Sequence, residues 1–288
     1  MNQIWVSRYT KILTAVTFLL IVAGGLVTST KSGLSVPDWP LSYGQWMPPM
    51  VGGIRYEHTH RIIASLVGFM TLVLTIWIGC LENRKWVRWI TISAFGAVVL
   101  QGILGGLTVM FLLPAPISIF HACLAQTFFA LMVSLSYFYS KEWFVLKPLV
   151  SSDGLSEIKS SLIMMILLVY LQLILGASVR HTANHMVLVS HIASGFIVFI
   201  YAVMLMNRII KNYENEKQLT RPAIFLGLIT LFQLALGMGS FIFSFMIRQG
   251  IQIRPGKIFF ITAHQSLGAL LLATSVFLFL RILKQMKT

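Results

Sequence analysis

Long apolar stretches alternate with short polar connections along the whole chain. Eight of these stretches contain the roughly 20 residues that an α-helix needs to cross a bilayer, so the pattern predicts eight membrane-spanning helices. The first stretch follows Arg8, but no A-x-A-like cleavage site follows it, and we expect it to be retained rather than removed as a secretory signal. The expected spans are 11–30, 58–80, 89–111, 117–139, 161–180, 187–207, 222–246 and 258–281.

The composition supports an all-α integral membrane protein. Only 10% of the residues are charged, against roughly 25% in soluble domains, and the mean hydropathy is +0.83. A formal net charge of +14 would suggest nucleic-acid binding in a soluble protein. Here the basic residues lie mostly in short connections between apolar stretches, where membrane topology explains them better. We therefore expect no nucleic-acid partner.

The distribution of charge predicts how the helices are oriented. With the amino terminus inside, 15 of the 22 Lys and Arg residues fall on the inner side, which favours both termini inside. Six of the eight acids also lie in inner connections, whereas Asp38 and Glu57 face outward. The seven outer cations are Lys31, Arg55, Arg61, Arg180, Arg248, Arg254 and Lys257.

A short motif recurs in alternate helices, with a glutamine followed four residues later by a glycine. It occupies Gln101–Gly105, Gln172–Gly176 and Gln233–Gly237, and Leu20–Gly24 is a degenerate version. Each helix that carries the motif is the first helix of a similar helical hairpin, and repeats of this kind build many membrane folds. Alternatively, the small residues merely permit close helix packing, although this explains the glycines better than the glutamines.

The second helix of each expected hairpin carries a histidine a short way in from its outer end. These residues are His60, His121, His191 and His264. A single histidine in a membrane helix often serves only as a hydrogen-bond partner. Four at matching depth in four repeated units are not expected by chance. The remaining histidines lie at or beside outer helix ends and receive no role from the sequence: His58, His181 and His185.

The four histidines suit metal ligation. Pairing adjacent hairpins gives two four-helix bundles, with His60 and His121 in one and His191 and His264 in the other. Neutral imidazoles at one depth on facing helices are typical axial ligands of haem iron. A zinc site is less attractive because no cysteine or carboxylate cluster completes a tetrahedral set. A proton relay stays open as an alternative.

Glu57 lies three residues before His60, so both side chains project from nearly the same helix face. A carboxylate beside a haem in a partly dry pocket is suited to proton transfer, whereas the alternative is an interfacial residue paired with an arginine. Arg61 suits a haem propionate, although snorkelling to the lipid surface is an equally ordinary role. No acid stands three residues before the other three histidines; those positions are Ser118, Leu188 and Ile261.

The connection between the first two helices is long and contains several prolines and tryptophans. Prolines flank Asp38–Trp39 and disfavour a regular helix there. We weigh a lid over the first bundle against an interfacial anchor. The cysteines, Cys80 and Cys123, are expected near opposite membrane faces, so no disulfide is implied. Cys123 points to a different helix face from His121 and is not expected to be a ligand.

Three features together resemble the haem A synthase family: Glu57-x-x-His60-Arg61, the segment Pro37-Asp38-Trp39-Pro40 and the four spaced histidines. The resemblance covers nearly the whole chain. It implies eight transmembrane helices in two pseudosymmetric four-helix bundles. It also implies a membrane oxidoreductase that converts haem O to haem A by oxidising the C8 methyl of the porphyrin to a formyl group, for the assembly of haem-copper terminal oxidases.

The resemblance gives the first bundle, residues 1–140, the catalytic role. Glu57 is expected to be the catalytic carboxylate, and His60 and His121 to hold the substrate haem O. Some bacterial relatives carry a cysteine pair in outer loops that this chain lacks, which leaves the electron acceptor open.

The second bundle, residues 160–288, is expected to hold a resident haem b through His191 and His264. An inner linker at 141–159 joins the two bundles. Two other classes compete with this interpretation: a bis-histidine electron-transfer cytochrome without substrate chemistry, and a haem transporter or chaperone. Glu57 favours chemistry, since an electron carrier has no evident need for that carboxylate.

The expected surroundings follow from the same resemblance. Besides membrane lipid and haem O, transient partners are expected to be haem O synthase and an electron acceptor. Because no long amino-terminal extension precedes the first helix, we expect a multi-pass protein of the bacterial plasma membrane, with the haem sites toward the outer side.

Overall fold

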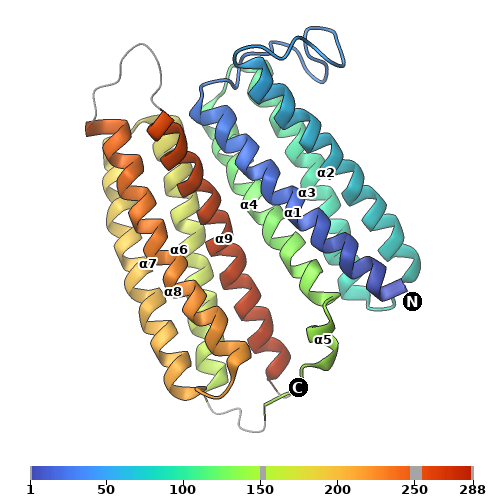
Figure 1. Cartoon of the computed structure of the whole chain (residues 1–288), viewed down its shortest axis with the longest axis vertical. Coiled ribbons are helices and arrows are strands. Elements are labelled where there is room, and N and C mark those ends of the chain that lie inside the picture. The colour runs from blue at the N-terminus through green and yellow to red at the C-terminus, as the bar shows by residue number, and fades with distance from the viewer. Residues whose placement is uncertain (1, 150–153, 247–254, 287–288) are drawn as a thin grey trace.

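The computed structural model describes residues 2–149, 154–246 and 255–286, and this part of the chain is built from helices and their connections (Figure 1). Eight of the described helices are long and apolar enough to span a membrane, which confirms the predicted number. They are α1 (Asn2–Ser29), α2 (Ile54–Leu81), α3 (Lys85–Met110), α4 (Ala115–Phe138), α6 (Leu155–Thr182), α7 (His185–Asn212), α8 (Lys217–Phe241) and α9 (Pro255–Gln285). A short helix, α5 (Lys141–Val145), and a π-helical turn, η1 (Ile242–Met246), accompany them.

Each of the eight long helices begins before the apolar span from which it was predicted. Helix α1 begins at Asn2 rather than at residue 11, and α6 begins at Leu155 rather than at residue 161. An apolar stretch marks only the part that crosses hydrocarbon, whereas the helix itself continues into the polar interface. Helix α5 was not predicted; Ser140 caps it by accepting a hydrogen bond from the Trp143 amide at 3.2 Å.

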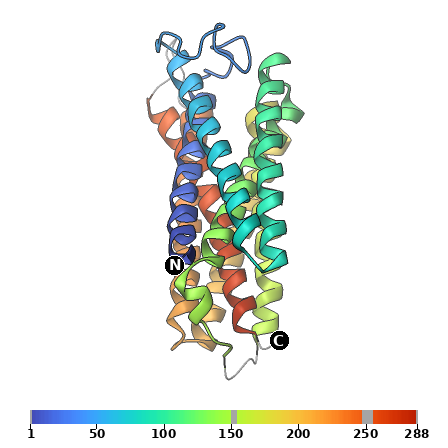
Figure 2. The ribbon, with the colours of Figure 1, turned by 90° about the vertical axis from the view of Figure 1, so that its right-hand side faces the viewer.

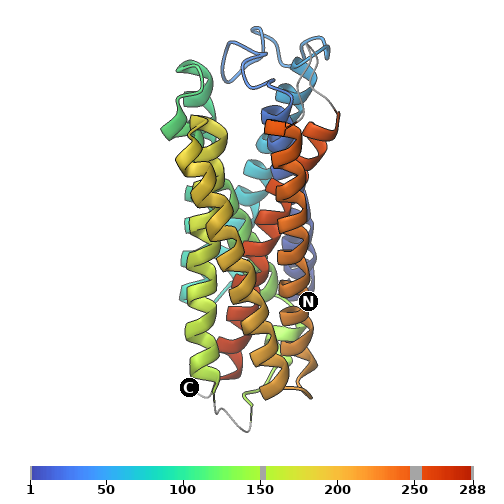
Figure 3. The ribbon, with the colours of Figure 1, turned by 90° about the vertical axis from the view of Figure 1, so that its left-hand side faces the viewer.

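The long helices form two groups of four, α1–α4 and α6–α9, each around its own core (Figure 1), and in Figure 3 the second group lies in front of the first. The first core includes Leu13, Leu74, Val87 and Leu135, one from each helix. The second includes Leu162, Leu205, Leu226 and Leu278. A smaller cluster joins the groups where Ile21 of α1 and Phe129 of α4 contact Ala269 of α9. Because lipid is as apolar as these side chains, close packing holds the helices together.

Helix α1 begins and helix α9 ends at the same end of the molecule, which we call the terminal end; the opposite end carries residues 30–53 and is called the loop end (Figures 1 and 2). Three ion pairs lie at the terminal end, Glu82–Arg84 at 2.8 Å, Glu142–Arg281 at 2.5 Å and Glu157–Arg208. Four charges used for the predicted orientation, Arg248, Arg254, Lys287 and Asp153, lie outside the described residues. That the terminal end faces inside stays a prediction.

Candidate functional site

Each of the four predicted histidines lies against a glycine of the preceding long helix in its hairpin. The pairs are Gly24–His60, Gly105–His121, Gly176–His191 and Gly237–His264. A Cβ atom built on these glycines would lie 3.1, 3.5, 3.1 and 3.0 Å, respectively, from Cε1 of the imidazole. Three of these distances are shorter than ordinary van der Waals contact, so the glycines leave the space that the rings occupy. The repeated glycine is therefore a seat for the histidine.

The repeated glutamine holds the backbone of the same histidine in two of the hairpins. Gln101 Nε2 donates to the carbonyl of His121 at 2.9 Å, and Gln233 Nε2 donates to the carbonyl of His264 at 3.0 Å. Gln172 donates instead to Ser194 Oγ, one turn beyond His191. The first hairpin has Leu20 at this position and no amide to donate. These bonds account for the glutamines that close packing alone did not explain.

The orientation of one imidazole is fixed by a hydrogen bond. His264 Nδ1 donates to the carbonyl of Gln233 at 3.1 Å, which leaves Nε2 unprotonated and able to bind a metal. The corresponding carbonyls of Leu20, Gln101 and Gln172 face the other three imidazoles. There Nδ1 is buried and makes no hydrogen bond. The same backbone position therefore faces the histidine in all four hairpins.

The structure brings His191 and His264 together, which were predicted to form a pair. The ring centroids of His191 and His264 are 6.0 Å apart, with the ring planes at 84°. Two metal–imidazole bonds of about 2 Å each, added to the two rings, span a comparable separation. His60 and His121 lie within electrostatic range of one another. Neutral imidazoles facing in pairs fit the axial positions of a haem. Among the described residues no group of three His, Cys, Asp or Glu side chains that could hold a metal ion occurs.

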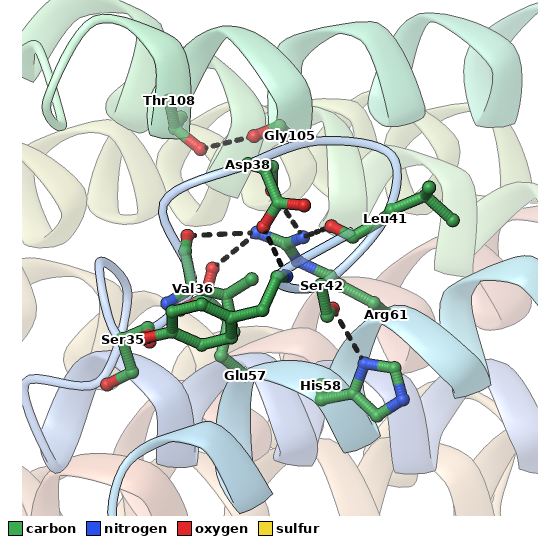
Figure 4. Close-up of polar contacts among 11 residues, drawn as sticks. Ser35, Val36, Asp38, Leu41, Ser42, Glu57, His58, Arg61, Gly105 and Thr108 are labelled. Carbon is green, nitrogen blue, oxygen red and sulfur yellow. Dashed lines mark hydrogen bonds and ion pairs between the residues drawn. The ribbon is translucent and has the colours of Figure 1, made fainter. Parts of the chain in front are cut away.

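Glu57 is buried, and both of its carboxylate oxygens have partners (Figure 4). Oε1 accepts from Arg61 Nη2 at 2.7 Å, and Oε2 accepts from the amide of Val36 at 2.9 Å. The pairing with arginine that the sequence left as an alternative is thus present. Glu57 stands one turn from His60 on the same helix, as predicted, and connects that turn to the loop.

Arg61 holds the loop onto helix α2. Its Nη1 donates to the carbonyls of Asp38 at 2.7 Å and Leu41 at 2.8 Å, while Nη2 reaches the carbonyl of Val36 at 3.4 Å (Figure 4). The side chain is only 15% exposed, so it does not snorkel to the lipid surface. The contact with a haem propionate predicted for Arg61 stays a prediction.

The loop covers the loop end of the first helix group and is internally ordered (Figures 1 and 2). The Trp39 ring lies against Gly106 of α3, where a Cβ atom would be 2.8 Å from Trp39 Cδ2. Asp38 accepts hydrogen bonds from the amides of Gly44 and Tyr43 at 2.8 and 2.6 Å. The bond from Gly44 is the main cause that lowers the pKa of Asp38 below its ordinary value, assisted by Tyr43 and Arg61. These contacts support a lid.

His58 and the cysteines take positions that the sequence only partly anticipated. His58 is buried, and its Nδ1 lies 2.8 Å from Ser42 Oγ, so this histidine fastens the loop (Figure 4). Sequence reasoning missed this contact because nothing marks Ser42 as a partner. Both cysteines are free; Cys80 is exposed and Cys123 is buried. His181 lies within electrostatic range of His121, and His185 is the exposed first residue of α7.

Comparison with known proteins identifies one matching family model, described as COX15-CtaA, cytochrome oxidase assembly protein. It matches residues 7–52 and 54–189. The match includes Glu57, His60 and His121 and ends before His191. The similarity between the second pair of histidines and the first therefore rests on the glycine seats described above and not on this match.

Several curated relatives are named heme A synthase. The protein of Geobacillus kaustophilus is 30% identical over 171 residues, covering 57% of this chain and 52% of the relative. That of Bacillus pumilus is 26% identical over 236 residues, covering 72% and 76%. That of Symbiobacterium thermophilum is 28% identical over 179 residues, covering 60% and 58%. The matched region thus spans between about half and three quarters of each relative.

Proposed function

Because this chain belongs to the COX15-CtaA family of cytochrome oxidase assembly proteins, we propose that it acts as a haem A synthase, oxidising the C8 methyl of haem O to a formyl group. The observation that carries the proposal is the pair of facing histidines, His191 and His264, repeated by His60 and His121 on the same glycine seats. The names of the relatives favour a synthase over an electron-transfer cytochrome or a haem transporter.

In this proposal each helix group holds one macrocycle. His60 and His121 bind the substrate haem O, and His191 and His264 bind a resident haem b. A bound haem b supplies one-electron redox chemistry. The hydrogen bond from His264 Nδ1 to Gln233 orients the imidazole and presents Nε2 for ligation.

Glu57 is proposed as the catalytic carboxylate. Oxidation of a methyl group releases protons as well as electrons, and a carboxylate within reach can accept them. Glu57 is buried on the helix turn that carries His60, and its only described acidic neighbour at the loop end, Asp38, is engaged with Tyr43 and Gly44. Its position supports a proton acceptor beside the substrate rather than in bulk solvent.

The membrane setting is also proposed. The excess of cations at the terminal end supports placing that end inside a bacterial plasma membrane, with the histidine pairs toward the outer side. The substrate would then come from a haem O synthase, and electrons would leave to an acceptor, through transient contacts in both cases.

Pigment extraction after co-expression with a source of haem O tests the proposal. Membranes containing the chain should yield haem A, and membranes containing the His60→Ala variant should not. Haem b without any haem A in the wild-type extract would contradict the synthase and leave an electron-transfer cytochrome. Extracts with neither pigment would contradict both.

A further inference from the structure

Three cations gather at the loop end where α1, α6 and α9 meet. Arg180 lies in the last turn of α6, Lys257 in the first turn of α9, and Lys31 is the second residue after the end of α1. Lys257 is close enough to Lys31 and Arg180 for the charges of both to act on it. We call these three residues the cation cluster. It lies between the two helix groups, because α1 belongs to the first group and α6 and α9 to the second.

The described acids at this end are already engaged elsewhere. Glu57 pairs with Arg61, and Asp38 accepts from the amides of Tyr43 and Gly44. None of the four ion pairs found among the described residues involves the cation cluster. Within the described part of the chain the cluster therefore has no carboxylate to balance its charge.

Arg180 is partly buried, and its hydrogen bonds within the described part of the chain all go to neutral groups. Its Nη1 donates to Gln265 Oε1 at 2.8 Å, and its Nη2 donates to Ser29 Oγ at 3.0 Å and to the carbonyl of Gly25 at 3.4 Å. Ser29 Oγ in turn lies 3.0 Å from Thr262 Oγ1. These bonds fix the guanidinium between helices, but removing an unpaired charge from water remains costly until an anion joins it.

The acceptors of Arg180 adjoin both candidate haem sites. Gln265 directly follows His264, and Gly25 directly follows Gly24, the seat of His60. One guanidinium thus contacts a neighbour of a histidine in the second pair and a neighbour of a seat in the first. Arg61, the cation that the sequence singled out for a propionate, is instead engaged with three loop carbonyls and Glu57.

We propose that the cation cluster is a binding site for the carboxylate groups of the macrocycle held by His191 and His264, with Arg180 as its central residue. A planar guanidinium binds carboxylates in a bidentate fashion, and the flanking ammonium groups add charge without requiring a fixed geometry. The site balances the buried charge of Arg180 and positions the macrocycle edge at the boundary between the two helix groups. This inference rests on the proposed function, since it requires a bound haem.

Reduction potentials test the site. A cation near the iron disfavours the oxidised state, which carries one more positive charge than the reduced state. Arg180→Gln should therefore lower the midpoint potential of the bound haem, changing the equilibrium constant for reduction about tenfold, or ~59 mV for one electron. Arg180→Lys, which keeps the charge, should stay near the wild-type potential. Arg221→Gln, which removes an exposed cation of α8 at the terminal end, is the matched control and should not change it.

The outcomes separate this inference from the proposed function. Full haem content with an unchanged potential in Arg180→Gln would overturn it; a lipid phosphate as the bound anion would give that result. If Arg180→Gln does not retain haem, Lys257→Gln decides: a lowered potential supports the site and an unchanged one overturns it. If the wild-type protein binds haem but makes no haem A, while Arg180→Gln shows the expected shift in potential, the proposed synthase activity is contradicted and the carboxylate site is supported.

Discussion

Gly237 lies so close to His264 that a Cβ atom on the glycine would be 3.0 Å from the imidazole Cε1. The same relationship holds in the other three hairpins, at 3.1 to 3.5 Å. The helix pair in each hairpin therefore approaches closely at the level of its histidine, and the ring fills the gap that the missing side chain leaves. Each of the four histidines is thus held by contact with the preceding helix of its hairpin.

The first prediction concerns this seat. Gly237→Ala should push the His264 ring away and lower the content of haem b several-fold, at a cost of about 1–3 kcal/mol in stability from overpacking. Haem content of the purified protein, measured by spectroscopy, checks it. Gly102→Ala in α3 is the matched control, because a Cβ there has no neighbour within 4 Å, and it should keep its haem. Equal haem content in the two variants would contradict the seat.

The second prediction concerns the second histidine pair. His191→Ala and His264→Ala should each remove most of the b-type haem, since each variant deletes one of the two facing histidines that we propose as its ligands. The absorption spectrum and the haem-to-protein ratio measure this. His185→Ala changes an exposed histidine at the start of α7 and should leave both unchanged. Unaltered spectra in both ligand variants would exclude His191 and His264 as the haem ligands.

The third prediction separates chemistry from loop anchoring at Glu57. Glu57→Gln and Arg61→Gln both break the same buried ion pair, whose side chains are 5% and 15% exposed. Removing one partner of a buried pair costs about 3–5 kcal/mol, so both variants should loosen the loop and increase hydrogen exchange at residues 36–42. Of the two variants, only Glu57→Gln should retain substrate haem and make no haem A, whereas Arg61→Gln should still make haem A. Equal loss of haem A in both variants would mean that the carboxylate only anchors the loop.

The fourth prediction concerns acid stability at the terminal end. Partial burial acts to raise the pKa of Glu82, but hydrogen bonds from Arg84 and Tyr139 outweigh it and lower the value from 4.5 to about 2. The folded pKa lies below the unfolded one, so the stabilisation is fully present above about pH 4.5 and is lost as the pH falls toward 2.

With allowance for solvent screening, Glu82→Gln should lower the stability by about 1–2 kcal/mol at pH 7 and by progressively less below pH 4.5. Thermal unfolding in detergent between pH 3 and 7 measures it. Glu157→Gln removes an exposed pair with Arg208, whose side chains are 64% and 40% exposed, and should change little at any pH. A difference between Glu82→Gln and wild type that does not shrink in acid would contradict the ion pair as its source.

The eight helices and the placing of a histidine on the second helix of each hairpin could be predicted because both follow from periodic features of the sequence. An apolar stretch of about 20 residues has few alternatives to a spanning helix. The glutamine and glycine of the motif were equally visible, but their function was not. Only the folded hairpin shows that Gln233 holds the carbonyl of His264 and that Gly237 receives its ring.

The loop and the contacts between helix groups could not be predicted in the same way. Arg61 binds the carbonyls of Val36, Asp38 and Leu41, and a carbonyl carries no mark in the sequence because every residue has one. Arg180 reaches Gly25 across 155 positions of the chain. Such contacts depend on how two bundles meet, which no local pattern encodes.

Leu20 stands where the other three hairpins have a glutamine, and this single replacement changes how the first hairpin holds its histidine. The side chain of Leu20 has no amide group that could donate a hydrogen bond to the turn of α2 that carries His60. That turn is held instead by Arg61 and Glu57, which pair with each other and hydrogen-bond to the irregular connection between α1 and α2. We expect His60 to be the most compliant of the four histidines, able to shift along the helix axis as the loop adjusts. A ligand that must accept and release a macrocycle needs that compliance, and one that holds a permanent macrocycle does not.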